Sequence, residues 1–197
     1  MKHYVFIIAL ILGLTNKSTN IDLTPKMLKI IEKEINKSWK ELEVSRSSLF
    51  ISDHISDDLH IEANNSFVLL NNTDTLAYLF IRRTNGCVIG GCTDENVMAK
   101  PISNNFAERY EHFDYMIILN RDLSIRKVKV LVYDGEYGYE ITSKLWLKQF
   151  IGYCGENLNY GSDIQAISGA TVSAQSITDD IQLLVQFAKK MRALGVI

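Results

Sequence analysis

The chain has 197 residues, of which 47% are hydrophobic and 22% are charged, as in a globular protein with a core of ordinary size. Its 21 Lys and Arg residues against 23 Asp and Glu residues give a formal net charge of −2. Because neither sign is in clear excess, the composition argues against a nucleic-acid-binding protein and against an acidic disordered tail.

Residues 1–20 have the pattern of a signal peptide or an N-terminal anchor. Lys2 and His3 precede an apolar run over residues 4–14. That run is shorter than the roughly 20 residues that a membrane-spanning helix needs, but it matches the apolar centre of a secretory signal. We therefore expect export to the periplasm or cell envelope. A buried N-terminal element and an uncleaved membrane anchor are the alternatives.

The next region, residues 21–104, predicts a helix followed by strands. Thr24 and Pro25 are typical of a helix N-terminus, and apolar residues at helical spacing extend the helix to about Val44. The apolar positions are Met27, Ile30, Ile31, Ile35, Trp39 and Leu42. Two short apolar runs, 67–70 and 76–81, predict strands.

Three cysteines, Cys87, Cys92 and Cys154, do not form a metal-ligand pattern, since no CxxC pair or suitably spaced histidine accompanies them. Two interpretations stay open. Cys87 and Cys92 are buried free thiols, or they form a disulfide if the protein is exported.

The last region, residues 105–197, predicts a hairpin and two helices. The strands are 113–119 and 125–133, joined by a turn at 120–124, with Val128, Val130 and Val132 on one buried face. A helix is expected over 139–151, with Leu145 among its buried residues, and a second over 172–194, with Leu194 on its buried stripe. These elements predict an α+β fold, in which helices flank an antiparallel sheet. The N-terminal helix and strands either extend that sheet or form a separate lobe.

A run of small and hydroxylated residues, Ser168-Gly169-Ala170-Thr171, stands directly before the last helix. The first N–H groups of a helix have no internal partners, and the helix dipole favours negative charge there, so a phosphate fits such a place. The simpler interpretation is that Thr171 or Ser173 is the N-cap residue.

This motif resembles the attachment sequence of the FMN-binding domain family, in which the final threonine carries FMN through a phosphoester bond. The order of strand, strand and helix before it is similar to the same family, so the resemblance covers about residues 105–190. Members include electron-carrying subunits of the sodium-pumping NADH:quinone oxidoreductase and of related ion-translocating ferredoxin oxidoreductases. Small stand-alone exported domains also belong to the family, and this chain looks more like those.

The resemblance implies that Thr171 anchors FMN, with the cofactor-binding residues Ser168, Gly169, Ala170, Gln165 and Glu140. It further implies a flavin transferase that moves FMN from FAD to the threonine, and a redox protein or quinone-linked partner. The function expected is electron relay between these partners, with membrane association as an option, rather than self-contained catalysis. A small flavin-dependent reductase is a further alternative, although no nicotinamide fingerprint is present.

One position departs from the family pattern. Gln165 stands where the family has an aspartate, and Asp163 lies two residues upstream. Non-covalent FMN and a flavin-free binding or scaffold domain of the cell envelope therefore stay open beside covalent attachment.

Several aromatic residues close in sequence are candidates for stacking on a flavin ring. They are Tyr133, Tyr137, Tyr139 and Trp146, and core packing is the alternative for at least two of them. The three internal histidines, His54, His60 and His112, show no metal-ligand spacing, and we expect them to be surface or packing residues.

Overall fold

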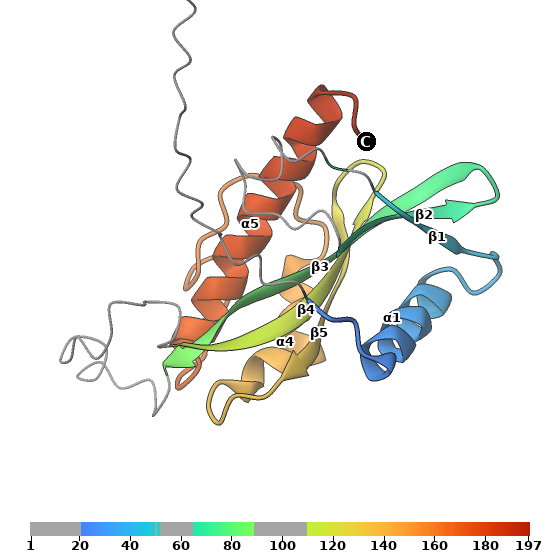
Figure 1. Cartoon of the computed structure of the whole chain (residues 1–197). Helices are drawn as coiled ribbons and strands as arrows, with labels where there is room; N and C mark the ends of the chain where they lie inside the picture. Colours follow the sequence, from blue (N-terminus) through green and yellow to red (C-terminus); the bar gives the residue numbers. More distant parts are fainter. Residues whose placement is uncertain (1–20, 50, 52–64, 89–109) are drawn as a thin grey trace, which may run out of the picture.

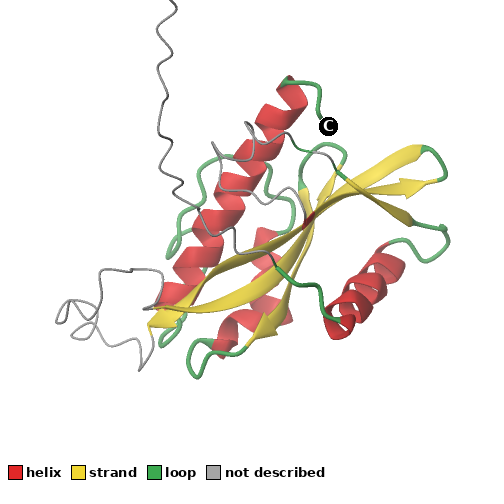
Figure 2. Cartoon of the chain, in the orientation of Figure 1, coloured by secondary structure: helices red, strands yellow, loops and turns green. Residues whose placement is uncertain are grey.

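The computed structural model describes residues 21–49, 51, 65–88 and 110–197. In this part of the chain, one antiparallel sheet in the order β1-β2-β3-β4-β5 is flanked by helices (Figures 1 and 2). The predicted α+β class is confirmed. The strands are β1 (Ser45–Ser48), β2 (Ser66–Asn71), β3 (Asp74–Val88), β4 (Tyr110–Asn120) and β5 (Ile125–Tyr133). The helices are α1 (Pro25–Ser38), η3 (Tyr139–Thr142), α4 (Lys144–Leu147), η4 (Lys148–Phe150) and α5 (Thr171–Ala193).

The N-terminal strands extend the sheet that the C-terminal hairpin begins. β3 pairs with β4 from Ala77 opposite Asn120 to Val88 opposite Tyr110. All four predicted strands are present, and β3 is much longer than the run 76–81 from which we predicted it. β1 was missed because its sequence, Ser-Arg-Ser-Ser, carries no apolar residue and is exposed along its whole length.

The inner strand β4 is buried on both faces and separates two hydrophobic layers. Alternate side chains of β4, as expected for a strand, contribute to opposite layers. Phe113, Tyr115, Ile117 and Leu119 pack with α5 and α4, whereas Met116 and Ile118 pack with α1. Figure 1 shows α1 and α5 on opposite sides of the sheet.

The α1 helix begins as predicted but ends earlier. Thr24 is the N-cap, and its Oγ1 accepts a hydrogen bond of 3.3 Å from the backbone N–H of Met27. The helix ends at Ser38 rather than near Val44. At the next residue, the ring of Trp39 packs against the guanidinium group of Arg126, whose Cζ lies 4.6 Å from the ring centroid. Leu42 consequently lies outside the helix and is 42% exposed.

The helix predicted over 139–151 is wrong as a continuous element. It is divided into η3, α4 and η4, and the backbone of Ser143 is extended, with a ψ of 124°. This break changes which positions face the core. Leu145 is therefore 77% exposed, while Leu147 is buried in its place.

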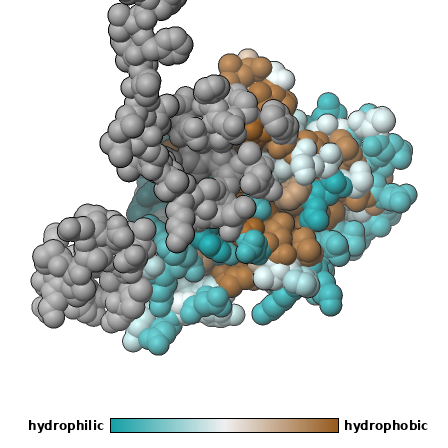
Figure 3. Space-filling view, in the orientation of Figure 1, coloured by the Kyte–Doolittle hydropathy of each residue, from teal (hydrophilic) through white to brown (hydrophobic). Residues whose placement is uncertain are grey.

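Two further burial predictions are wrong. Tyr115 pairs with Val130 and Asp114 with Val132, so a β-bulge at Leu131 moves Val132 to the α1 side of the sheet, away from Val130. Leu194 lies just beyond α5 and is 66% exposed. Figure 3 shows hydrophobic residues gathered at that end of α5.

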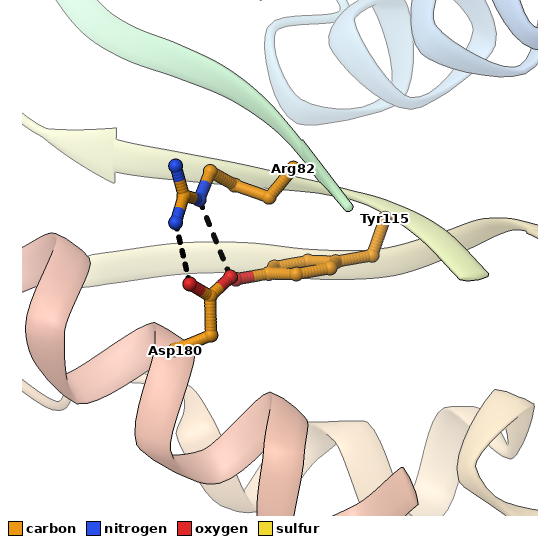
Figure 4. Close-up of polar contacts among 3 residues, drawn as sticks. All are labelled: Arg82, Tyr115 and Asp180. Carbon is orange, nitrogen blue, oxygen red and sulfur yellow. Dashed lines mark hydrogen bonds and ion pairs between the residues drawn. The ribbon is translucent and has the colours of Figure 1, made fainter. Parts of the chain in front are cut away.

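A largely buried ion pair and a fully buried tyrosine fix α5 to the sheet (Figure 4). The Arg82 Nη2 of β3 donates to Oδ1 of Asp180 on α5 at 2.5 Å, and the Tyr115 hydroxyl of β4 donates to Oδ2 at 2.6 Å. Burial, together with the negative charge of Asp180, raises the pKa of Tyr115 well above its ordinary value, which keeps the hydroxyl protonated as a donor.

Replacing Asp180 with alanine should lower the free energy of unfolding by about 3 kcal/mol, because it removes one partner of a largely buried ion pair and the acceptor of the fully buried Tyr115 hydroxyl. Urea unfolding measures the change. The matched control is Asp179→Ala at the preceding residue, which is exposed and accepts a hydrogen bond from Gln175. We expect the control to change stability by less than about 0.5 kcal/mol. Equal losses in the two variants would contradict the role given to Asp180.

Candidate functional site

The predicted attachment motif forms the turn that leads into α5. Ala170 is fully buried in the core, whereas Ser168, Gly169 and Thr171 are exposed. Gly169 has a φ of +81°, and a Cβ built there would meet no atom within 4 Å. The buried methyl group of Ala170 thus holds the turn against the core, while the Thr171 side chain lies at the surface.

The start of α5 lacks a side-chain cap among the described residues. Its N-cap residue is Ala170, and no side chain accepts a hydrogen bond from the first turn. The alternative that Thr171 or Ser173 caps the helix is therefore wrong. The first turn also carries no acidic residue, and the first hydrogen bond of the helix runs from the Ala174 N–H to the Ala170 carbonyl at 2.9 Å. The preceding N–H groups are free of intrahelical acceptors, as at any helix start.

Ser173 points the other way, into a buried polar cluster. Its Oγ lies 3.0 Å from the Tyr133 Oη and 3.7 Å from the Cys87 Sγ. Cys87 is disulfide-bonded, and its Sγ is 3.9 Å from the Gly169 carbonyl oxygen. The free-thiol interpretation is thus wrong for Cys87. Its sequence-predicted partner, Cys92, lies outside the described residues, and Cys154 is free and exposed.

The β-bulge in β5 explains how Tyr133 reaches this cluster. A bulge shifts the alternation of a strand by one residue. Beyond Leu131, Val132 therefore faces the α1 layer and Tyr133 packs on the α5 layer. There Tyr133 lies 5.3 Å, between ring centroids, from Phe113, and its hydroxyl donates to the Tyr137 carbonyl oxygen.

Gly138 closes the cluster and brings the start of η3 beside the start of α5. Its φ is +84°, and a Cβ there would lie 2.6 Å from the Tyr133 Oη and 2.8 Å from the Ser173 Oγ. Glu140 follows two residues later, in the same segment, and is exposed.

Gln165 is held through its backbone. Its carbonyl oxygen accepts a hydrogen bond of 2.8 Å from the Trp146 Nε1, and its N–H donates to the Gln149 Oε1 at 2.8 Å. Gln165 is exposed. The loop that carries the motif is in this way tied to α4 and η4.

The four aromatic candidates divide into three environments. Trp146 is buried and packs on Phe150, so core packing accounts for it. Tyr133 is half-buried in the polar cluster. Tyr137 and Tyr139, on either side of Gly138, are 48% and 65% exposed. Only these last two, among the four, are exposed.

Sequence reasoning gave no role to Glu111, which also borders the cluster. Its Oε1 accepts from the Glu136 N–H at 3.3 Å, while its Oε2 is buried and has no hydrogen-bond partner among the described residues. A Cβ at Gly135 would lie 2.2 Å from that oxygen. A single charged residue near the start of a strand carries no sequence signal for such a position.

Charge and burial together favour the neutral form of Tyr133. Burial raises the pKa of Tyr133, the hydrogen bond with Ser173 lowers it, and the carboxylates of Glu111 and Glu140 raise it, with a raised pKa as the net result. The hydroxyl thus stays protonated, as its hydrogen bond to the Tyr137 carbonyl requires.

No family model matches the chain, and no curated protein matches it either. In the described ranges, no group of three potential metal ligands is present. His112 is exposed, as expected, while His54 and His60 lie outside those ranges. The helices of the described part are all too short or too polar to cross a membrane. Residues 1–20, with the predicted signal, are not described.

Replacing Gly138 with alanine should destabilise the protein by about 3 kcal/mol or more, because the new Cβ is strained at positive φ and collides with two hydroxyl oxygens. Gly161→Ala is the matched control, since its φ is +91° but a Cβ there meets nothing within 4 Å. The control should lose only about 1–2 kcal/mol. Thermal and urea unfolding of both variants measures the difference, and similar losses would show that the cluster is not tightly packed.

The raised pKa of Tyr133 predicts a loss of stability at alkaline pH. The unfolded chain ionises this hydroxyl near pH 10, whereas the folded protein keeps it neutral to higher pH. The stabilisation is therefore complete below pH 10 and is lost as pH rises through the folded pKa. Urea unfolding at several pH values should show a shallower alkaline decline for Tyr133→Phe than for the wild type. Parallel curves would contradict this assignment.

Proposed function

We propose that this protein is an exported flavoprotein that carries FMN on Thr171 and relays electrons between redox partners. The observation that carries the proposal is the position of Thr171. The residue that the resemblance marks for attachment is exposed, and it is the first residue of a long helix whose start has no side-chain cap among the described residues.

The surroundings of Thr171 suit a phosphate. The first-turn N–H groups and the helix dipole favour an anion, and the first turn of α5 holds no carboxylate to oppose one. The Ser168 hydroxyl is exposed beside them, and the space around Gly169 is open, which permits close approach of a ligand to the backbone. These residues fit the phosphate of FMN.

The neighbouring segment suits the ring system. Gly138 lies against Ser173, and Tyr137 and Tyr139 on either side of it are exposed. Exposed aromatic side chains provide flat surfaces for stacking. Glu140 follows in the same segment. It is a candidate hydrogen-bond acceptor for the flavin.

Bound FMN accepts one or two electrons, and it can therefore link a two-electron donor to a one-electron carrier. The chain contributes an anchor and an environment. A phosphoester at Thr171 prevents loss of the cofactor outside the cytoplasm, where free FMN is scarce. Thr171 is an anchor in this proposal, not a nucleophile in the electron-transfer reaction.

A flavin-free scaffold or binding domain of the cell envelope is the second candidate. Gln165 favours it, because the family has an aspartate at this position in the sequence that the transferase reads. The backbone contacts of Gln165 with Trp146 and Gln149 do not depend on its side chain. The loop can therefore keep its conformation whether or not a transferase acts on it.

The test is to express the full-length protein with a flavin transferase and to measure its mass and absorption spectrum. We expect a mass gain of one FMN minus one water, with yellow colour that stays with the precipitated protein. Thr171→Val keeps the shape of an exposed side chain and should abolish both signals. Thr142→Val, a threonine of η3, is the control and should retain them.

Yellow colour that moves to the supernatant on denaturation would replace covalent attachment with non-covalent binding. A colourless, unmodified wild-type protein that is folded by circular dichroism would overturn the flavin proposal in favour of the scaffold function. Secretion is checked separately by locating the protein in the periplasmic or envelope fraction.

A further inference from the structure

The segment before the attachment motif is held by side chains rather than by a strand or a helix. Both backbone polar groups of Gln165 have side-chain partners. The carbonyl oxygen accepts from the Trp146 Nε1, and the N–H donates to the Gln149 Oε1, each at 2.8 Å. Two residues later, the Ile167 N–H donates to the Tyr160 Oη at 3.0 Å. We define Trp146, Gln149 and Tyr160 as the side-chain clamp.

The residues of the side-chain clamp are themselves fixed by the fold. Trp146 is only 6% exposed, and its ring centroid lies 5.3 Å from that of Phe150. The Gln149 Nε2 donates to the Trp146 carbonyl oxygen at 3.1 Å, which orients the amide that the loop meets. Tyr160 pairs through its backbone with Ile164, which is fully buried. The clamp is therefore an ordered support for the loop.

Only two exposed residues lie between the clamped segment and the buried end of the motif. The Ile167 carbonyl oxygen accepts from the Ala170 N–H at 3.2 Å, and Ala170 is fully buried. Ser168 and Gly169 are exposed between these two points. Thr171 already belongs to α5, so the helix determines its position. What the clamp controls is the path of Ser168 and Gly169 beside Thr171.

A loop that loses its contacts opens at little cost in free energy, and an enzyme that recognises one conformation acts only on the fraction of molecules in that conformation. We infer that Trp146, Gln149 and Tyr160 are positioning residues, which hold Ser168 and Gly169 in the conformation in which Thr171 is modified. The clamp acts on the backbone of the loop and is formed before any cofactor is attached.

The consequence for FMN rests on the proposed function. In the transferase reaction, the phosphoester to the Thr171 hydroxyl oxygen forms as the pyrophosphate bond of FAD breaks. AMP leaves, and the hydroxyl proton is released to solvent. The clamp residues take no part in these bonds. They set the rate of loading through the fraction of molecules whose loop is closed.

Hydrogen exchange of the full-length, flavin-free protein tests the conformational part of the inference. Gln149→Met and Tyr160→Phe each remove one acceptor with little change in volume. Amide exchange over residues 165–170 should become about threefold to tenfold faster in each variant, as expected for the loss of one hydrogen bond. Gln149→Glu keeps an acceptor for the Gln165 N–H and should exchange close to the wild-type rate. Protected amides in β4 would show that the fold is intact.

The consequence for loading is measured on the double variant Gln149→Met/Tyr160→Phe. We expect the initial rate of FMN attachment by the transferase to be at least about threefold lower than for the wild type, because the loss of two contacts opens the loop in a large fraction of the molecules. Mass spectrometry measures the attached FMN over time, at a protein concentration that limits the rate.

The matched control is the double variant Gln182→Met/Tyr153→Phe, which makes the same chemical changes in contacts of the same loop. The Gln182 Oε1 accepts from the Leu158 N–H at 2.6 Å, and the Tyr153 hydroxyl donates to the Glu156 carbonyl oxygen. Both contacts lie upstream of the clamped segment. Exchange over residues 165–170 and the rate of loading should therefore match the wild type.

Three results would overturn the inference. They are unchanged exchange over residues 165–170 in both single variants, equally fast exchange in the control double variant, and unchanged loading of the clamp double variant despite faster exchange. A wild-type chain that never acquires FMN overturns the proposed function instead. In that case, faster exchange confined to the clamp variants still supports the side-chain clamp, so the two failures are distinguishable.

Discussion

The Asp180 carboxylate on α5 joins two neighbouring strands at once, and the candidate site depends on where it holds the helix. Arg82 of β3 and Tyr115 of β4 approach its two oxygens from the sheet. A carboxylate largely removed from water needs both charge compensation and hydrogen bonds, and few placements of α5 satisfy both. Because the helix is fixed to the sheet at Asp180, the first turn of α5 lies at the ends of β3 and β5. There Ser173 contacts Cys87 and Tyr133.

The β-bulge at Leu131 in β5 also determines the candidate site, because it sets the direction in which Tyr133 points. Without the bulge at Leu131, the alternation of the strand would point Tyr133 toward α1. Ser173 would then lose its contact with the Tyr133 hydroxyl. Bulges often redirect side chains in this way next to functional sites. Here the bulge stands only two residues before Tyr133, and it also sends Val132 to the opposite layer.

The elements with strong local signals were predictable from sequence. The hairpin of β4 and β5 and the Thr24 N-cap follow from alternation and capping residues, and the long α5 follows from its helical spacing. Prediction from the local sequence pattern was wrong where tertiary contacts determine the bounds of an element. The end of α1 depends on the contact of Trp39 with Arg126, and the division of residues 139–151 depends on an extended Ser143.

The site was predictable only in part, for the same reason. The motif itself is contiguous, and its position at a helix start could be read from the residues that follow it. Glu111 and the contact of Tyr133 with Ser173 could not be foreseen, because they depend on β-strand register and on a bulge. The partners of Asp180 could not be foreseen either, because they come from strands at sequence separations of 98 and 65 residues.

Thr171 and Ser173 show how one turn of helix serves two requirements. Successive helical residues are turned by about 100°, so two residues separated by one other lie roughly on opposite sides of the axis. Thr171 is accordingly exposed and Ser173 is fully buried. In the proposed function, Thr171 must be reached by a modifying enzyme, whereas the buried Ser173 must find its partners inside the protein. A motif that begins a helix meets both needs within three residues, provided that the interior supplies a partner for the buried hydroxyl, as Tyr133 and Cys87 do here.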